Sequence, residues 1–355
     1  MKFQIQQERL KILFGIVVFL FGGFFLFYAE YKFQFSEKAT FIGGTFNEQQ
    51  KNTERIGIFS GILCAQAGRR PLALILAGDP EARPLSGISR AEMVIEIPVV
   101  AGGITRYLAF YQCNEPEEIG SIRSARSPFI GLAKGYGAIF GHWGGEKDAL
   151  TKLRNGVIDN IDALPNPANA FWRKQGVPMP HDGFTNFSRL KKAAEKLTYN
   201  LQLTTNNFFK FKNDSNISNI SNNSNQVITV GYPGKFQVSY HYKPETNSYL
   251  RLKGKTPEID ALTGEQIGAK NVVVLWANIY PTYYQYDNVE LDGKEGRLST
   301  FTGGKDIQGR WRKESFDKPL LFFDAQGKAL EFEPGNIWVQ VLGLEQEVNV
   351  LNFYD

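Results

Sequence analysis

The chain has 355 residues, with 40 Lys and Arg, 36 Asp and Glu, a formal net charge of +4 and two cysteines. Its basic residues are scattered among acidic ones, which excludes the concentrated basic face of a nucleic-acid-binding protein. Two cysteines exclude a disulfide-built scaffold and a cysteine-rich zinc site, and they leave open whether Cys64 and Cys113 form one bridge or stay two thiols.

The first predicted element is a helix at residues 12–29, a stretch without any charged residue. At about 1.5 Å per residue this helix would be roughly 27 Å long, close to the ~30 Å hydrocarbon core of a bilayer. Lys2, Arg9 and Lys11 precede it, and basic residues favour the cytoplasmic side of a membrane. We therefore predict a cytoplasmic leader at 1–11, one transmembrane helix at 12–29 and an extracytoplasmic remainder.

A cleavable signal peptide is the alternative to this anchor. Signal peptidase needs small residues just before the cleavage point, whereas the bulky Phe27 lies two positions before Ala29. The sequence thus favours an uncleaved helix and a single-pass location in the cytoplasmic membrane.

After this helix, residues 30–68 are polar and poorly periodic, which is typical of a stalk. Residues 69–205 alternate apolar strands with helical patterns, and they predict an α/β (α+β) domain. Its strands are expected at 72–77, 91–98 and 105–112, and its helices at 128–135 and 189–201.

The second half of the chain has a different pattern. Residues 206–226 are rich in Asn and Ser and are predicted to be a linker, because they offer little apolar area to offset the entropy of ordering. Residues 227–355 alternate apolar and polar side chains and predict an antiparallel β domain. Apolar residues recur there at a spacing of two, as in Phe236, Val238, Tyr240 and Tyr242, and many of them are aromatic, as is Phe301 further on; this favours a core over a sugar-stacking platform. The predicted fold class is an α/β (α+β) N-terminal domain plus a C-terminal antiparallel β domain, behind one transmembrane helix.

Three arginines lie at predicted strand ends or in loops. Arg106 follows a Gly-Gly pair at the start of a strand, and Arg123 and Arg126 lie in a Gly- and Ser-containing segment just before a predicted helix. Backbone N–H groups, the helix dipole and guanidinium groups would converge there on a bidentate oxyanion. We predict that these arginines bind an anionic ligand. The alternative is that they only pair with acidic residues such as Glu96 or Glu115 and hold loops in place.

Other candidate site residues surround this segment. His142 lies in a glycine-flanked loop at a strand end, where an imidazole can approach a ligand closely. Glu96 ends a predicted strand and would orient an arginine, so we predict catalytic roles for His142 and Glu96. Arg173 and His181, in or near a proline-containing loop, are predicted to bind the ligand. A purely structural role, with a hydrogen bond to a carbonyl, is the alternative for His142.

The sequence lacks the short signatures of several enzyme classes. It contains no HExxH zinc motif, no GxSxG nucleophile elbow, and neither a Walker A nor a GxGxxG pattern. We therefore predict no metal and no cofactor.

Many of these segments together resemble the YerB-like family of bacterial envelope proteins and lipoproteins of unknown function. The matching stretches are 70–73, 81–87, 96–98, 102–106, 119–126, 142–145, 171–173, 180–181, 260–264 and 334–338. They occur in order over nearly the whole predicted extracytoplasmic part, and the resemblance implies a bacterial cell-envelope location.

Two features depart from the family pattern. The family favours an Asp-Asn-His run after the first strand, whereas this chain has Ala77, Gly78 and Asp79 there. Lipoprotein members attach through a cysteine just after a signal sequence, whereas Cys64 lies far beyond the apolar segment. A looser similarity in layout, with an acidic and Arg-containing loop at 79–83, points to the LytR-CpsA-Psr phosphotransferases.

We expect an outward-facing envelope protein that binds a phosphate- or carboxylate-bearing wall or lipid component through its arginines. Its C-terminal part would dock an envelope protein partner or extend the groove. One alternative is an outer-leaflet phosphotransferase that uses Mg²⁺, with ligands among Asp79, Glu81, Glu96 and Asp159. Another alternative is a scaffold without a small ligand, in which the arginines would be buried in ion pairs and line no open pocket.

Overall fold

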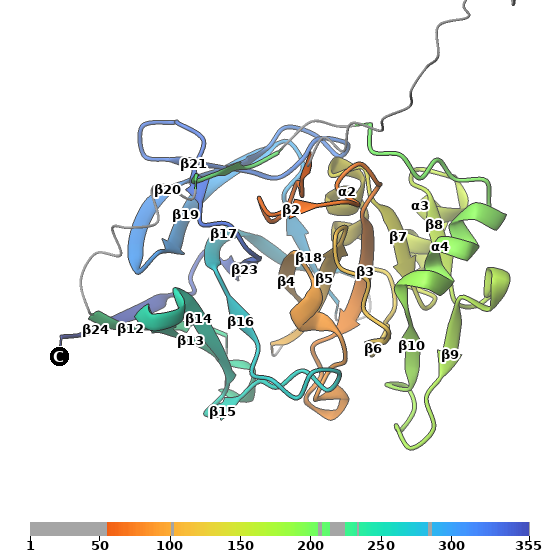
Figure 1. Ribbon diagram of the computed structural model, residues 1–355, viewed down its shortest axis with the longest axis horizontal. Coiled ribbons are helices and arrows are strands. Elements are labelled where there is room, and N and C mark those ends of the chain that lie inside the picture. Colours follow the sequence, from red (N-terminus) through yellow and green to blue (C-terminus); the bar gives the residue numbers. More distant parts are fainter. Residues whose placement is uncertain are drawn as a thin grey trace, which may run out of the picture. The chain divides into compact units, whose positions relative to one another are not determined.

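The computed structural model describes residues 55–100, 103–204, 208–213, 224–232, 234–282 and 286–354, which belong to one compact unit (Figure 1). The predicted leader at 1–11, the predicted transmembrane helix at 12–29 and the predicted stalk up to residue 54 lie outside the described residues. Within the described ranges, no helix has the length and apolar character needed to cross a membrane.

The largest element is a mixed sheet of 11 strands. Its strands are β3 (Leu72–Ala77), β4 (Met93–Val100), β5 (Ile104–Tyr111), β7 (Ile139–His142), β8 (Asn160–Asp162), β17 (Asn271–Pro281), β18 (Asp287–Glu290), β19 (Lys294–Thr302), β20 (Lys305–Lys313), β21 (Leu321–Asp324) and β23 (Ile337–Gly343). Their order is β21-β20-β19-β17-β23-β4-β5-β3-β7-β8, and β18 pairs with β17.

A second sheet of six strands packs beside the first. Its strands are β12 (Ser224–Val230), β13 (Val238–Lys243), β14 (Ser248–Lys253), β15 (Thr256–Pro257), β16 (Gly268–Ala269) and β24 (Val348–Tyr354). They are ordered β15-β14-β13-β12-β24, with β16 paired to β14.

Smaller sheets and short helices complete the described part. The small sheets pair β1 (Arg55–Ile56) with β2 (Leu63–Cys64), β10 (Gly183–Thr185) with β6 (Ile119–Gly120) and β9 (Phe171–Arg173), and β11 (Lys210–Phe211) with β22 (Glu331–Phe332). The α-helices are α2 (Ser127–Gly135), α3 (Lys147–Arg154) and α4 (Phe187–Lys196).

The predicted fold class was wrong. The structure is mainly β, with three α-helices in the described ranges, and it is not an α/β (α+β) domain followed by a separate antiparallel β domain. Strands from both halves of the sequence share the large sheet, because β23 pairs in parallel with β4. Periodicity identifies a strand but not its partner, and these two strands are separated by more than half of the chain.

Local predictions were more accurate. The strand at 72–77 is β3, and the helix at 128–135 is α2, extended by one residue. The strands expected at 91–98 and 105–112 are β4 and β5 with shifted ends, and the second helix ends earlier than predicted. The aromatic residues Phe236, Tyr240 and Phe301 are buried, as expected of core residues.

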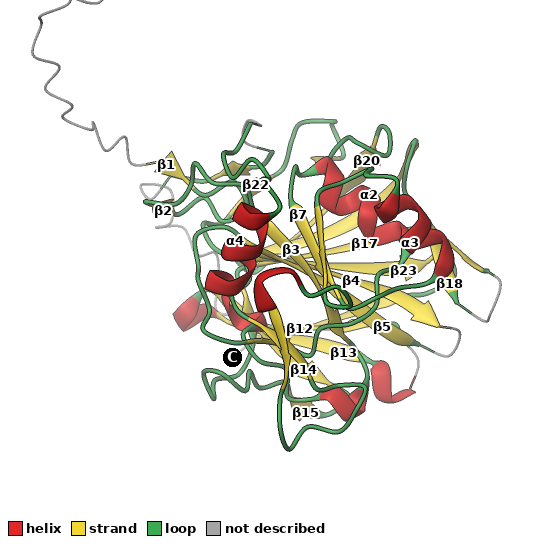
Figure 2. Cartoon of the chain, turned by 90° about the vertical axis from the view of Figure 1, so that its right-hand side faces the viewer, coloured by secondary structure: helices red, strands yellow, loops and turns green. Residues whose placement is uncertain are grey.

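The large sheet is buried on both faces. Tyr107 and Ala109 of β5 pack in one core with Tyr240 and Tyr249 of the six-stranded sheet. Their neighbour Leu108 points to the opposite face, into a second core that contains residues of α2. Figure 2 shows this layering, with α2 and α3 on one side of the large sheet and β12–β15 on the other.

A network of buried charges lies between the two sheets. Glu96 of β4 accepts hydrogen bonds from Arg251 Nη2 at 2.6 Å and Lys253 Nζ at 2.5 Å. Arg251 Nε also donates to Glu258 at 2.6 Å, and Thr105 Oγ1 donates to Glu96 at 2.6 Å. Glu96 and Arg251 are completely buried, so two carboxylates and two cations neutralise each other inside the protein.

The network holds Glu96 in its ionised form. Burial alone would raise the pKa of Glu96, but Lys253 and Arg251 lower it from 4.5 to about 2. Because this folded-state pKa lies below the ordinary value, the stabilisation is complete above pH 4.5 and is lost as the pH falls toward 2.

A disulfide joins Cys64 of β2 to Cys113, which follows β5. The bond closes a loop with a sequence separation of 49 residues and ties the β1–β2 hairpin to the large sheet. Disulfides persist in oxidising compartments, so this bond agrees with a location outside the cytoplasm.

We predict that replacing both cysteines, Cys64→Ser with Cys113→Ser, lowers the free energy of unfolding by about 4 kcal/mol, because the unfolded chain regains the freedom of the loop. Denaturant unfolding of both proteins, with and without reductant, measures the difference. The double variant is the control, since reductant should not affect it. Equal stability of the unaltered chain under both conditions would contradict the prediction.

We also predict that Glu96→Gln lowers the free energy of unfolding by about 3–5 kcal/mol, because it leaves Arg251 and Lys253 buried with one carboxylate too few. The matched control is Glu295→Gln. Glu295 is 57% exposed in its ion pair with Arg310, so this change should cost less than about 1 kcal/mol. Similar losses for both variants in denaturant titrations would show that the buried network adds little.

Candidate functional site

Four charged residues meet at one end of the large sheet. Asp79 lies two residues after the end of β3, Arg106 lies near the start of β5, and Arg123 and Arg126 lie in the loop that leads into α2. We call these four residues the arginine cluster. The carboxyl ends of strands and the starts of helices are common places for ligand sites in sheets of this kind.

Strand pairing and loop contacts place these side chains. Ala77, the last residue of β3, is opposite Arg106 in the antiparallel register with β5. The loop after β6 runs along β3, because Arg123 N donates to Ile75 O at 2.9 Å. Gly78 permits the close approach, since a Cβ atom there would lie 2.3 Å from Thr105 Oγ1.

The cluster contains more positive than negative charge. Arg106 Nη1 donates to Asp79 Oδ2 at 2.6 Å, and Arg123 Nε lies 3.9 Å from the same oxygen. Arg126 Nε lies 3.7 Å from Glu146 Oε2, and its guanidinium stacks 4.3 Å from the centre of the Tyr286 ring. In the ion pairs seen among the described residues, these three guanidinium groups contact the carboxylates of Asp79 and Glu146.

Several donors in the cluster are buried without a partner. The Nε atoms of Arg106, Arg123 and Arg126 make no hydrogen bond within the described ranges, and neither does Nδ1 of His181. Arg106 is only 4% exposed and Arg126 and His181 are each 7% exposed. A buried donor without a partner is costly, more so when it is charged.

The pKa values reflect this crowding of cations. Burial, together with the charges of Arg123 and Arg126, lowers the pKa of Arg106 to about 10, although Asp79 opposes this shift. Burial likewise lowers the pKa of Arg126. Burial and the charge of Arg123 lower the pKa of His181.

A small pocket of about 170 Å³ opens beside the cluster and contains Arg123 in its wall. Arg123 Nη1 donates to Pro180 O at 2.9 Å. Arg173 lines the same pocket; it pairs with Asp182 at 2.8 Å and stacks 4.8 Å from the Trp143 ring. The pocket therefore connects the predicted ligand residue Arg173 to the arginine cluster through Arg123.

The two predicted catalytic residues lie elsewhere. Glu96 belongs to the buried charge network between the sheets. His142 at the end of β7 is completely buried, with Nδ1 2.8 Å from Gly144 O and Nε2 3.2 Å from Asn160 Oδ1. Both ring nitrogens thus face protein oxygens, which matches the structural alternative weighed for this residue.

The carboxylates considered for Mg²⁺ are not gathered into a metal site. Asp79 pairs with Arg106, Glu96 with Arg251, and Asp159 with Arg70 at 2.6 Å. Over the ranges that the structure describes, no three His, Cys, Asp or Glu side chains are arranged to hold a metal ion.

Three residues contribute to the cluster in roles that the sequence did not predict. Asp79, predicted as part of the acidic loop at 79–83 and as a candidate Mg²⁺ ligand, is the counter-charge of Arg106 and Arg123. Glu146 pairs with Arg126 and also accepts a hydrogen bond from the first residue of α2. Arg83 donates to Gly78 O at 2.9 Å. The position of Asp79 just after a predicted strand was a usable signal, whereas Glu146 becomes a neighbour only through tertiary folding.

Both halves of the chain match one family. Residues 59–200 match the N-terminal domain of the "Protein of unknown function (DUF3048)" and residues 228–339 match its C-terminal domain. The chain belongs to this family of proteins, whose function is not known.

One relative is "Putative lipoprotein YerB" of Bacillus subtilis, which is 30% identical over 287 residues, covering 77% of this chain and 81% of the relative. The crystal structure of the YerB protein from Bacillus subtilis has a TM-score of 0.74 with 29% identity, and the match covers 84% of this chain and 99% of that one. The predicted membership of the YerB-like family is confirmed.

These findings correct the predicted localisation. The relative is named a putative lipoprotein, which is a lipid-attached protein. The predicted single-pass helix conflicts with the mode of attachment in that name and is not retained.

We predict that Arg123→Gln raises the pKa of His181. Burial lowers this pKa below 6.5, and the positive charge of Arg123 lowers it further, so removing that charge should move the titration to higher pH. NMR titration of the ring resonances measures the shift, because the chain has only 3 histidines. His241, whose pKa is lowered by burial and Lys243, is the control and should not change. A His181 pKa at or above 6.5 in the unaltered chain would contradict the prediction.

Proposed function

We propose that this protein is an extracytoplasmic envelope protein that binds an anionic ligand, bearing phosphate or carboxylate, at the arginine cluster. The name of the Bacillus relative supports the envelope location, and so does the disulfide between Cys64 and Cys113.

The carrying observation is that three guanidinium groups, two of them on buried residues, have buried Nε atoms that form no hydrogen bond among the described residues, although those of Arg123 and Arg126 lie 3.9 and 3.7 Å from carboxylate oxygens. Leaving a buried charged donor unpaired costs more than the roughly 1–3 kcal/mol of a neutral one. Oxygens of a bound anion would accept these hydrogen bonds and add negative charge beside the three arginines. Ligand binding would thus supply acceptors and negative charge that the arginine cluster lacks.

Arginine suits this task because its planar fork donates two parallel hydrogen bonds to a phosphate or carboxylate. The unpartnered Nδ1 of His181 adds a neutral group that can donate or accept, depending on its tautomer. The pocket lined by Arg123 and Arg173 offers a route from solvent and space for the uncharged part of the ligand.

The proposal is a binding function. Catalytic roles for Glu96 and His142 stay predictions and are not part of this proposal. Both side chains are completely buried, and both form hydrogen bonds within the protein. The scaffold alternative required that the arginines line no open pocket, whereas Arg123 and Arg173 do line one.

The test is calorimetric titration of the purified chain with inorganic phosphate, pyrophosphate and acetate, with chloride as the ionic-strength control. We expect binding of phosphate or acetate to the unaltered chain, together with a rise in the pKa of His181 in NMR titrations, because an added anion favours the imidazolium. Arg126→Gln and Arg123→Gln should each weaken binding by about 10- to 100-fold, because each removes one charge-assisted hydrogen bond worth about 1.5–3 kcal/mol.

The matched control is Arg310→Gln on β20, because Arg310 is 71% exposed and far from the cluster in the sheet order. Arg123 is the safer test variant, since its side chain is 16% exposed and its loss should disturb folding less than that of Arg126. Unchanged affinity in a folded Arg123→Gln protein, or failure of all three probes to bind the unaltered chain, would overturn the proposal.

A further inference from the structure

The six-stranded sheet ends in a long strand with a free side. In the part of the chain that the structure describes, β24 pairs with β12 alone, and the register runs without interruption from Ser224 opposite Tyr354 to Val230 opposite Val348. The free side of such a strand presents backbone N–H and C=O groups that can pair with another strand.

The other ends of the two sheets are protected and β24 is not. β15 has two residues and contains Pro257, β8 has three residues and contains Asp162, and β21 has four residues and contains Asp324. Short length, proline and charge are the usual devices that prevent pairing at a sheet edge. β24 has seven residues, no proline and no charge. Its Leu351 and Phe353 are 57% and 52% exposed.

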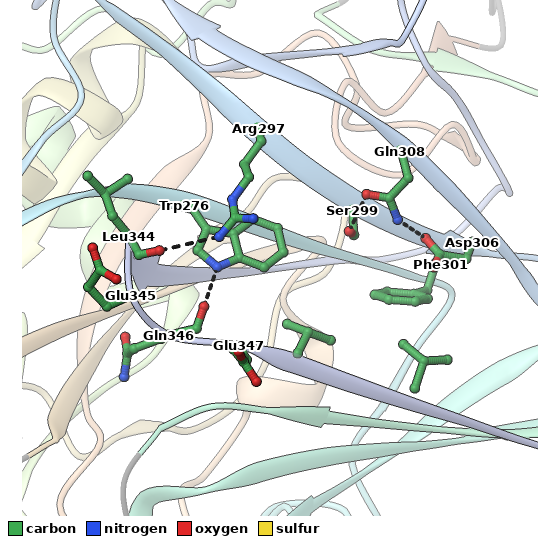
Figure 3. Close-up of a pocket in the computed structure, with 12 residues that line it drawn as sticks. Trp276, Arg297, Ser299, Phe301, Asp306, Gln308, Leu344, Glu345, Gln346 and Glu347 are labelled. Atoms are coloured by element: carbon green, nitrogen blue, oxygen red, sulfur yellow. Dashed lines mark hydrogen bonds between the residues drawn. The ribbon is translucent and has the colours of Figure 1, made fainter.

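A groove of about 450 Å³ lies along β24 (Figure 3). Its apolar lining comes from Leu344 and from Val348 and Val350 of β24, next to the buried side chains of Trp276 and Phe301. Alternation along β24 points Leu351 and Phe353 to the opposite face of the strand. A strand added to β24 would therefore meet apolar surface on both of its faces.

The rim of the groove is acidic. Asp306, Glu345 and Glu347 line it, and none of them forms an ion pair within the described residues. The one cation in the lining, Arg297, stacks 4.3 Å from the Trp276 ring and donates to Leu344 O at 3.3 Å, as Figure 3 shows. Burial raises the pKa of Asp306, the shift expected of a carboxylate that lacks a nearby cation.

We propose that β24 and this groove dock an extended segment of another protein, which adds a strand to β24 and carries Lys or Arg between apolar residues. The exposed edge supplies backbone pairing, the groove and the outer face take apolar side chains, and the acidic rim takes the cations. A second copy of this chain fits less well, because its own β24 offers no cation to the rim. The proposal does not depend on the arginine cluster.

The test uses a fluorescent heptapeptide of alternating Val and Lys, measured by anisotropy with the full chain. We expect it to bind at least tenfold more tightly than the same peptide with Glu in place of Lys. Methylation of alternate backbone nitrogens removes the donors needed for strand pairing and should weaken binding at least tenfold.

Two variants locate the site. Leu351→Lys places a charge on the exposed edge and should weaken binding of the Lys peptide at least tenfold, and Glu345→Lys with Glu347→Lys should reverse the preference between the two peptides. Leu164→Lys is the matched control, since Leu164 is also an exposed leucine, at 66%, in the loop after β8. Thermal unfolding checks that each variant is folded.

Several results would overturn the proposal. They are equal binding of the Lys and Glu peptides, full binding of the methylated peptide, and no effect of Leu351→Lys. Absence of binding by the Lys peptide at millimolar concentration would also reject it. A dimer in light scattering that Leu351→Lys converts to a monomer would identify a second copy as the occupant instead.

Discussion

The buried pairing of Glu96 with Arg251 and Lys253 is the interaction on which the rest of the structure depends. Glu96 comes from the first half of the chain and its two cations come from the second half, so the network joins the two sheets across the core. With Glu258 the charges balance, and Thr105 supplies a further donor to Glu96. A network of this kind tolerates little change, because removing one member leaves another charge buried and unpaired.

Strand β5 separates the buried charge network around Glu96 from the arginine cluster. Thr105 of β5 donates to Glu96 on one face of the sheet, and the next residue, Arg106, reaches Asp79 on the other. The first group of charges is balanced and sealed. The second has more cations than carboxylates, retains donors without partners among the described residues, and borders a pocket. This contrast is why we propose ligand binding at the arginine cluster and a structural role for Glu96.

The two regions that match the family are joined within one sheet. Residues 59–200 contribute β3, β4 and β5, residues 228–339 contribute β17, and β23 bridges them by pairing with both β17 and β4. Because the match to the YerB crystal structure extends over 84% of this chain, the shared fold includes strands from both regions. Neither of the two family-matched regions supplies all the strands of the large sheet by itself.

Local sequence patterns were sufficient to locate β3 and α2, to place aromatic residues such as Tyr240 in the core, and to recognise the family, because each of these depends on neighbouring residues or on short motifs. The pairing of β23 with β4, the disulfide, and the partners of Glu96 could not be derived in this way. They join residues that are far apart in sequence, and the periodicity of one sequence does not show which distant strand a given strand will contact. The fold class was therefore misjudged although most of its strands were found, and Glu96 was expected beside the arginines although its charge is neutralised on the opposite face of the sheet.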